Sequence, residues 1–239
     1  SSCKIMTSSD YKKAKEVVSS ELAQAGLHGK VTITKLSWTA LEFPTYHVSY
    51  TYSEKTYDDQ TVRLENETTF HDDWSSSSII FLPDYKKVFL EQKSIKNIEE
   101  KLEKEIKKQS LGLPIEFSIF LSNFYQEEKE EILDSIARKN LKEGKKDFAG
   151  YYQIPFQTLI DQELIRMTIY VDDTVSVKEQ DLEEAAKKLD ASKLPNGSYS
   201  FYYSNHKDDS EDTLSYSFKV KDGKVVFYED QKDELEDQN

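Results

Sequence analysis

Two stretches of this 239-residue chain share one order of features, and this order constrains the fold more than anything else in the sequence. Residues 94–123 and 176–205 each begin with serine, an apolar residue and lysine. Each continues through a helix-like segment and a Leu-Pro pair, and ends in Ser-Asn. The second stretch begins and ends 82 residues after the first, which aligns Phe117 with Tyr199 and Phe120 with Tyr202. Such a repeat predicts one supersecondary unit that is used more than once.

The pattern around the repeat predicts antiparallel sheets. In residues 45–52, tyrosine and valine alternate with polar residues, as expected for a half-buried strand. Several such segments follow one another through short turns, which favours antiparallel pairing. We therefore expect an α+β fold with three repeated helix-plus-antiparallel-sheet units, at 9–80, 81–160 and 161–230, between an N-terminal tether at 1–8 and an acidic tail at 231–239.

Local signals place the individual elements. Ser9 or Asp10 is expected to cap the first helix, which ends near Gly26. Asp222-Gly223 is suited to a tight hairpin turn between the last two strands. The repeat also predicts short leading strands ahead of the three helices, at residues 4–6, 87–93 and 167–175.

Residues 128–141 give two conflicting predictions. The repeat predicts strands here, with a hairpin at Gly144. The spacing of the apolar residues predicts a helix instead. We prefer the helix, because long periodic segments are the more reliable signal.

Composition excludes several classes of function. The formal net charge of −13 would repel a phosphate backbone, so nucleic acid is excluded as a partner. No run of 18 apolar residues occurs, so we expect no transmembrane helix. The chain has 7 glycines and no glycine-rich phosphate loop, which disfavours nucleotide-dependent enzymes. We expect no cofactor.

The single cysteine is Cys3, which cannot form an internal disulfide. Ser1-Ser2-Cys3 resembles the end of a bacterial lipobox, in which small residues precede an acylated cysteine. The resemblance implies a Gram-positive cell-envelope lipoprotein that is extracytoplasmic and reaches the membrane through a lipid on Cys3. The alternative is a terminal cysteine without a role. The order of a helix followed by a strand meander is also similar in layout to PepSY-like and cystatin-like modules of bacterial envelope proteins.

No arrangement of residues predicts catalysis. The Ser75–Ser78 run lacks the glycines of a nucleophile elbow, and no catalytic residue is assigned. Two clusters of histidine and carboxylates have side chains that bind zinc or manganese. The alternative, which we favour, is a polar turn after each strand. The candidate metal ligands are His71, Asp73, His206 and Asp208.

Aromatic residues and a terminal strand supply the binding candidates. Tyr202 lies out of phase with its apolar neighbours on the same strand, and Tyr151 and Tyr152 lie in a loop-like segment. These rings are candidates for a sugar or peptide platform, although strands with aromatics on both sides also occur in sheets covered on both faces. Val226 belongs to the last strand, 224–229, whose edge is a candidate for adding a peptide strand. The alternative is a strand paired on both sides.

Three functions remain open. The first is a non-enzymatic, monomeric envelope lipoprotein that binds an unknown protein or peptide, with the acidic tail favouring basic peptides. The second is a solute- or glycan-binding envelope protein. The third is a hydrolase with a dispersed carboxylate or metal site.

Overall fold

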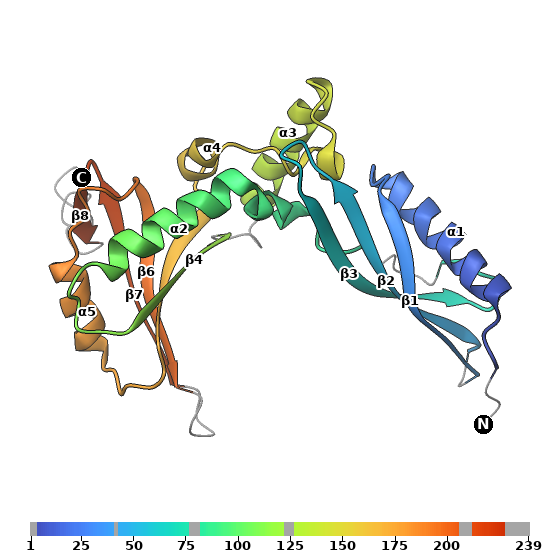
Figure 1. The fold of residues 1–239 in the computed structure, drawn as a ribbon, viewed down its shortest axis with the longest axis horizontal. Helices are drawn as coiled ribbons and strands as arrows, with labels where there is room; N and C mark the ends of the chain where they lie inside the picture. Colours follow the sequence, from blue (N-terminus) through green and yellow to red (C-terminus); the bar gives the residue numbers. More distant parts are fainter. Residues whose placement is uncertain (1–3, 41–42, 77–81, 122–126, 206–211, 228–239) are drawn as a thin grey trace. The chain divides into compact units, whose positions relative to one another are not determined.

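The computed structural model has the expected α+β fold and forms two compact units (Figure 1). Unit 1 contains Ser1–Lys93 and Leu133–Gln153, and unit 2 contains Ser94–Ile132 and Ile154–Asn239. We expect three consecutive units from the sequence, whereas the residues of the second of these, 81–160, are divided between the two observed units. The structure describes residues 4–40, 43–76, 82–121, 127–205 and 212–227.

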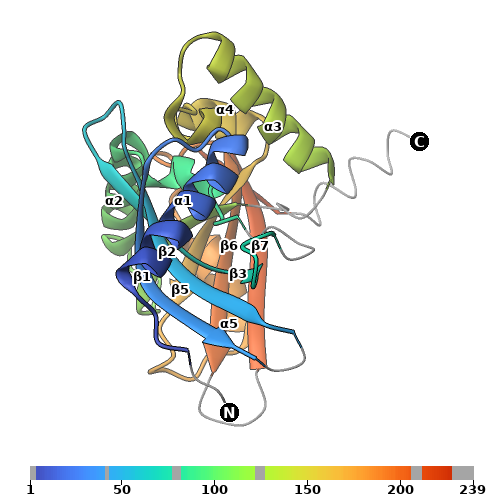
Figure 2. The same cartoon turned by 90° about the vertical axis from the view of Figure 1, so that its right-hand side faces the viewer.

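Unit 1 begins with a helix and an antiparallel meander. Helix α1 (Ser8–Gln24) lies across one face of a sheet with the strand order β1-β2-β3 (Figure 2). The strands are β1 (Lys30–Thr39), β2 (Thr45–Lys55) and β3 (Thr61–His71). The helix is capped by Thr7 rather than by Ser9 or Asp10. Asp10 lies three residues further on and accepts the Thr7 N–H at 2.9 Å, which completes a capping box.

The alternation in β2 separates a core face from an open face, as the sequence predicts. Tyr46, Val48, Tyr50 and Tyr52 are buried on the side of α1. Ala14, Val18 and Leu22 supply the buried stripe of the helix. The opposite face is polar, and includes Lys35, Ser37, His47, Ser49, Glu67 and Thr69.

In the described part of unit 1, two of the predicted leading strands do not form, whereas one predicted helix does. Residues 87–93 are not a strand, because η1 (Lys86–Glu91) is a 3₁₀ helix in which the neighbours Val88 and Phe89 are both buried. A strand would place them on opposite faces. Residues 4–6 form no strand either. Helix α3 (Glu127–Lys142) confirms the helix predicted over 128–141, and the alternative strands there are wrong.

Carboxylates hold the segment that follows α3 to the β2–β3 hairpin. Glu54 accepts a hydrogen bond from the Phe148 N–H at 2.9 Å, and Asp147 accepts one from the Tyr57 N–H at 2.8 Å. Phe148 and Ala149, in η2 (Asp147–Gly150), both have left-handed backbone angles. Because non-glycine residues rarely adopt these angles, the surrounding contacts must maintain them.

Asp58 is the most connected of these carboxylates. It accepts hydrogen bonds from the Thr56 hydroxyl at 2.6 Å, the Lys93 N–H at 2.9 Å and the Tyr152 hydroxyl at 2.8 Å. Burial raises the pKa of Asp58, but the hydrogen bonds from Thr56, Lys93 and Tyr152 outweigh burial and leave the pKa below its usual value. Ionised Asp58 therefore stabilises the fold at neutral pH, and this contribution is lost as the pH falls from about 4 toward the folded-state pKa.

We expect Asp58→Asn to lower the free energy of unfolding by about 1–2 kcal/mol at pH 7, with the half-exposed position limiting the loss. The difference from the unchanged protein should shrink at pH 3, because this pH lies below the usual pKa that the carboxyl has in the unfolded chain. Urea unfolding at the two pH values measures both numbers. Asp59→Asn is the control, because the ion pair of Asp59 with Lys55 is solvent-exposed and contributes at most about 1 kcal/mol. An equal loss for Asp58→Asn at both pH values would contradict the account.

Unit 2 contains a five-stranded sheet with the order β4-β5-β6-β7-β8. Its strands are β4 (Ile115–Leu121), β5 (Ile165–Val171), β6 (Gly197–Asn205), β7 (Asp212–Lys221) and β8 (Lys224–Phe227). Its helices are α2 (Lys93–Lys107), α4 (Phe156–Asp161) and α5 (Glu179–Lys188), together with the first residues of α3. Helix α2 crosses one face of this sheet (Figure 1).

The sheet of unit 2 is mixed, which corrects the expectation of purely antiparallel sheets. β5 and β6 are parallel, and the other neighbours are antiparallel. Parallel neighbours need a crossover connection, and α5 supplies it. The predicted turn at Asp222-Gly223 is confirmed, because both residues have positive φ between β7 and β8.

The two stretches of the sequence repeat form a helix and then a strand in each case. The first residues of β4 and β6, Ile115 and Gly197, are also 82 positions apart. Phe117 and Tyr199 are buried, whereas Phe120 and Tyr202 lie on the opposite face. Their sheet neighbours differ, since among the described strands β4 pairs with β5 alone and β6 lies between β5 and β7. The duplication and the resemblance in layout stay predictions.

Candidate functional site

The sheet of unit 2 has one face covered by helices and one face lined by polar and aromatic residues. On the covered side, the strands bury large side chains, including Phe117, Ile169, Tyr199, Phe201 and Phe218. The strand register aligns the remaining side chains in rows across the sheet. We call this surface the open face; its rows are Glu116-Tyr170-Tyr202-Ser215, Ser118-Thr168-Ser200-Ser217 and Phe120-Arg166-Ser198-Lys219.

A cleft of about 300 Å³ lies at one end of the open face. The rings of Tyr170 and Tyr202 meet there edge to face, with centroids 5.5 Å apart and planes at 79°. Tyr170 is 37% exposed, which leaves part of its ring accessible to a ligand. We call this the tyrosine cleft; it is lined by Glu116, Tyr170, Val171, Asp172, Asp173, Tyr202 and Ser204.

The chemistry of the tyrosine cleft suits a cation. Three carboxylates lie around two aromatic rings, and the strand residues Glu116 and Tyr170 are direct cross-strand neighbours. The faces of aromatic rings attract ammonium and guanidinium groups, and carboxylates pair with the same groups. Asp172 also accepts the Thr174 N–H at 3.0 Å, which fixes the turn that carries it.

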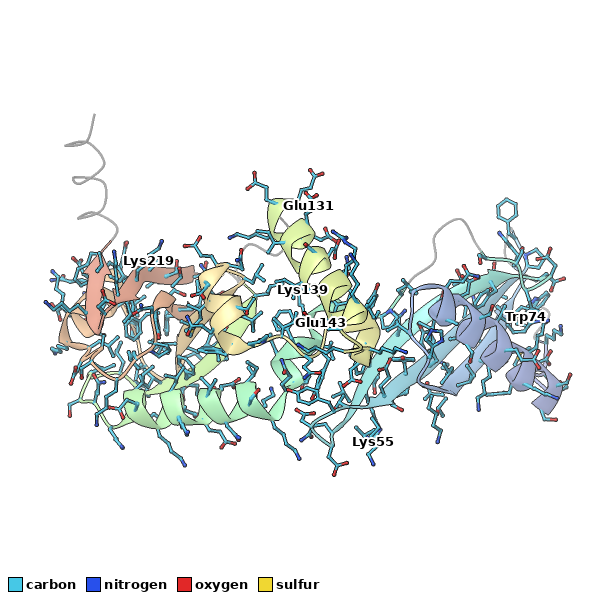
Figure 3. All side chains as sticks on the ribbon, turned by 90° about the horizontal axis from the view of Figure 1, so that it is seen from above. Lys55, Trp74, Glu131, Lys139, Glu143 and Lys219 are labelled. Atoms are coloured by element: carbon cyan, nitrogen blue, oxygen red, sulfur yellow. The ribbon has the colours of Figure 1, made fainter. Side chains whose placement is uncertain are left out.

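The other end of the open face is positively charged. Arg166 stacks on the ring of Phe120, with its guanidinium carbon 4.8 Å from the ring centroid. The structure shows no ion pair for Arg166 within the described residues, and its Nε atom is buried without a hydrogen-bond partner. Lys219, labelled in Figure 3, lies in the same row and pairs with Glu163 at 3.5 Å. Between the two ends, the buried Oγ1 of Thr168 also lacks a hydrogen-bond partner in the described chain.

The tyrosines predicted from the sequence lie in different environments. Tyr202 projects from β6 on the side opposite Tyr199, Phe201 and Tyr203, as predicted. Tyr151 and Tyr152 are buried in unit 1, and their hydroxyls donate to Asp134 at 2.6 Å and to Asp58 at 2.8 Å. Tyr152 is fully buried, so its ring contributes to packing and offers no surface to a ligand.

Sequence reasoning missed Tyr170, although the signal was present. Ile165, Met167, Ile169 and Val171 alternate along β5 and are buried. Tyr170 falls out of phase with them, as Tyr202 does on β6. The two strands are parallel neighbours in register, which places the two rings side by side. The expectation of purely antiparallel sheets does not make β5 and β6 parallel neighbours, so it could not predict that the two rings lie side by side.

The candidate metal ligands are only partly described. His71 is exposed at the end of β3, and Asp73 accepts hydrogen bonds from the hydroxyl and the N–H of Ser75 at 2.6 and 3.0 Å. These bonds lower the pKa of Asp73, the hydroxyl bond contributing most, and they form the polar turn that we favour. His206, Asp208 and Cys3 lie outside the described residues. Within the described ranges, no three histidine, cysteine, aspartate or glutamate side chains gather as a metal site.

The last strand also has a free side in the described part of the chain. Of the strands that the structure describes, β8 pairs with β7 only and forms the end of the sheet order. Val226 lies on the open face opposite Lys219. Residues 228 and 229 of the predicted edge lie outside the described residues, and peptide addition at this edge stays a prediction.

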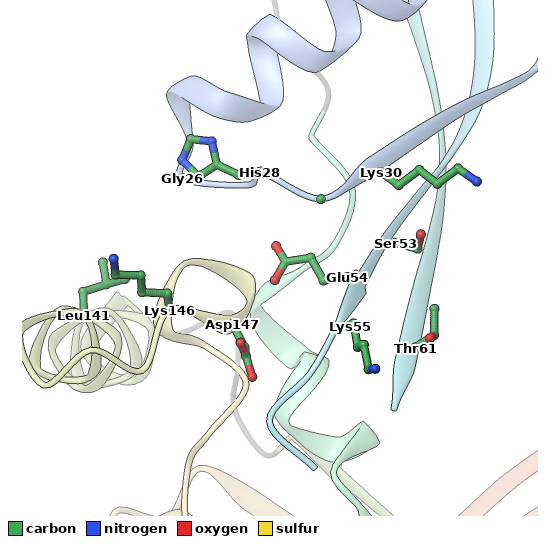
Figure 4. Close-up of a pocket in the computed structure, with 11 residues that line it drawn as sticks. Gly26, His28, Lys30, Ser53, Glu54, Lys55, Thr61, Leu141, Lys146 and Asp147 are labelled. Carbon is green, nitrogen blue, oxygen red and sulfur yellow. The ribbon is translucent and has the colours of Figure 1, made fainter. Parts of the chain in front are cut away.

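A larger cleft in unit 1, of about 1050 Å³, is less suited to binding (Figure 4). Glu54 points into it from β2, between the loop that carries His28 and the segment of Leu141 and Lys146. Both carboxylates in this cleft already accept hydrogen bonds within the fold: Glu54 from Tyr52 and Phe148, and Asp147 from Tyr57. The contacts therefore indicate that these carboxylates hold unit 1 together.

Comparison with known proteins does not assign the chain to a family. No family model, no curated protein and no solved structure matches the chain. Among the described residues, no helix has the length and apolar character needed to cross a membrane.

Proposed function

We propose that this chain is a non-enzymatic binding protein whose tyrosine cleft receives a lysine or arginine side chain of a peptide or protein partner. One observation carries the proposal: Tyr170 and Tyr202 meet in one cleft with the carboxylates of Glu116, Asp172 and Asp173. A cation at an exposed aromatic ring gains about 0.5–1 kcal/mol, and an exposed ion pair gains a similar amount. The cleft therefore contributes one anchor of a weak, extended contact.

A glycan is the second candidate, favoured by serine hydroxyls beside the rings. Ser204 lines the cleft, and the exposed Ser215 lies opposite Tyr202 in the strand register. Their hydroxyls can donate and accept hydrogen bonds with sugar hydroxyls, and a sugar ring can lie on Tyr170. A neutral sugar forms no ion pairs with the three carboxylates. A comparison of charged and uncharged ligands therefore distinguishes the two candidate functions.

The proposed location is outside the cytoplasm, on the membrane through a lipid on Cys3, and it rests on the resemblance of Ser1-Ser2-Cys3 to a lipobox. We expect the protein to fractionate with membranes in its native host and Cys3→Ala to release it, because acyl chains supply the membrane affinity. Western blotting of the membrane and soluble fractions measures this. Equal partition of both forms would contradict the lipid anchor.

The binding proposal is tested by nuclear magnetic resonance titration of the ¹⁵N-labelled protein. The probe is a seven-residue, serine-rich peptide with one lysine at its second position, called the lysine peptide below. We expect shifts at Tyr170, Tyr202 and their neighbours, and we expect Tyr170→Ala or Tyr202→Ala to weaken binding about two- to fivefold, because each removes an aromatic face.

Tyr11→Ala is the matched control, because Tyr11 on α1 is 38% exposed, close to the exposure of Tyr170. It should leave the affinity unchanged. A tetrasaccharide of N-acetylglucosamine is the probe for the second candidate. Shifts at the cleft with the sugar and none with the lysine peptide would replace the peptide function with the glycan function.

A further inference from the structure

We infer that the open face of unit 2 binds an extended peptide at two ends, with a basic residue in the tyrosine cleft and an acidic residue, four positions away, on Arg166. This inference rests on the proposed function and specifies the partner. It follows from the opposite charges that the strand register places at the two ends of the same face.

Arg166 has the features of a prepared carboxylate receptor. Its guanidinium is held against the ring of Phe120, which limits the side-chain freedom that binding would otherwise remove. It forms no ion pair within the described residues, although carboxylates outnumber basic residues in the chain, with 45 Asp and Glu against 32 Lys and Arg. A guanidinium in this position can form two parallel hydrogen bonds with a carboxylate.

The spacing between the two ends fixes the spacing of the peptide residues. Tyr170 and Arg166 are four residues apart on β5 and project from the same face. Four residues of extended chain span about 13 Å. A peptide extended along β5 therefore matches both ends with residues at positions i and i+4, which also share one side of an extended chain.

The row between the two ends is polar, but only its outer members are accessible. Ser118 and Ser217 are half-buried, whereas Thr168 and Ser200 are 1% and 3% exposed. The Oγ1 of Thr168 is buried without a hydrogen-bond partner in the described chain. The two ends therefore carry the recognition, and the hydroxyls of Ser118 and Ser217 can donate or accept beside the path of the peptide.

The test compares three peptides on the full chain by isothermal titration. The first is the lysine peptide, the second adds a glutamate at the sixth position, and the third moves the glutamate to the fifth. We expect the second peptide to bind about fivefold more tightly than the first, as for one exposed charge-assisted pair. The third should gain little, because its charges project from opposite sides of an extended chain.

Arg166→Gln should remove the fivefold gain and leave the affinity for the lysine peptide unchanged. Arg166→Lys keeps the charge but loses the planar stacking, and should restore part of the gain. Arg63→Gln is the matched control, since Arg63 is an exposed strand arginine in the sheet of unit 1. Thermal unfolding of each variant identifies any loss of fold.

The outcomes separate the inference from the proposed function. If the glutamate adds nothing while the lysine peptide still binds at the tyrosine cleft, the two-ended arrangement is wrong and the proposed function stands. If a glutamate at either position gives the same gain, the fixed spacing is wrong. If the lysine peptide itself does not bind, the proposed function fails and the inference fails with it.

Discussion

Gly150→Ala is expected to lower the free energy of unfolding of unit 1 by about 3 kcal/mol or more. Gly150 has a φ of 92°, a backbone conformation that disfavours any side chain. A β-carbon there would lie 2.3 Å from the carbonyl oxygen of Ala137 in α3, and this oxygen belongs to the backbone. The segment cannot move away freely, because Asn140 donates a hydrogen bond to the Gly150 carbonyl at 2.8 Å.

Gly144→Ala is the control for this substitution. Gly144 has a similar φ of 82°, but a β-carbon there would have nothing within 4 Å. It should therefore cost only the backbone strain, about 1 kcal/mol. Urea unfolding followed by tryptophan fluorescence measures both variants, because Trp38 and Trp74 both belong to unit 1. If the two variants lost the same free energy of unfolding, the close approach to Ala137 would not be the cause of the loss at Gly150.

Phe201→Ala is expected to lower the free energy of unfolding of unit 2 by about 3–5 kcal/mol. Phe201 is fully buried in the central strand and packs beside Phe218 with centroids 5.8 Å apart. Its neighbour Tyr202 projects from the opposite face and is half-buried. Tyr202→Ala should therefore cost only about 1 kcal/mol, mainly from the edge-to-face contact with Tyr170.

The contrast between these neighbouring residues tests whether the open face is open. Urea unfolding followed by far-ultraviolet circular dichroism measures both variants. A loss for Tyr202→Ala as large as that for Phe201→Ala would show that Tyr202 belongs to a core. The rings of the tyrosine cleft would then be unable to receive a ligand.

Local periodicity predicted much of the secondary structure. The alternation of Tyr46, Val48, Tyr50 and Tyr52 determined which face of β2 is buried, because a half-buried strand has a period of two. The apolar spacing over 128–141 correctly predicted α3 against the strands implied by the repeat. In both cases the information lies within about ten to fifteen residues of sequence.

Local sequence patterns could not predict how distant segments pair. Residues 87–93 have the composition of a strand, but tertiary packing buries Val88 and Phe89 together in a 3₁₀ helix. The parallel pairing of β5 and β6 depends on the crossover through α5, and it is this pairing that places Tyr170 beside Tyr202. The sequence therefore revealed Tyr202 as a candidate but not the ring and carboxylates that complete its site.

The most direct test of the central claim is the affinity of the chain for the lysine peptide before and after acetylation of the lysine. Acetylation keeps the length and most of the shape of the side chain and removes its charge. If the tyrosine cleft recognises a cation through its rings and carboxylates, acetylation should weaken binding about tenfold or more. Equal affinity for the two peptides, or binding to neither, would contradict the account.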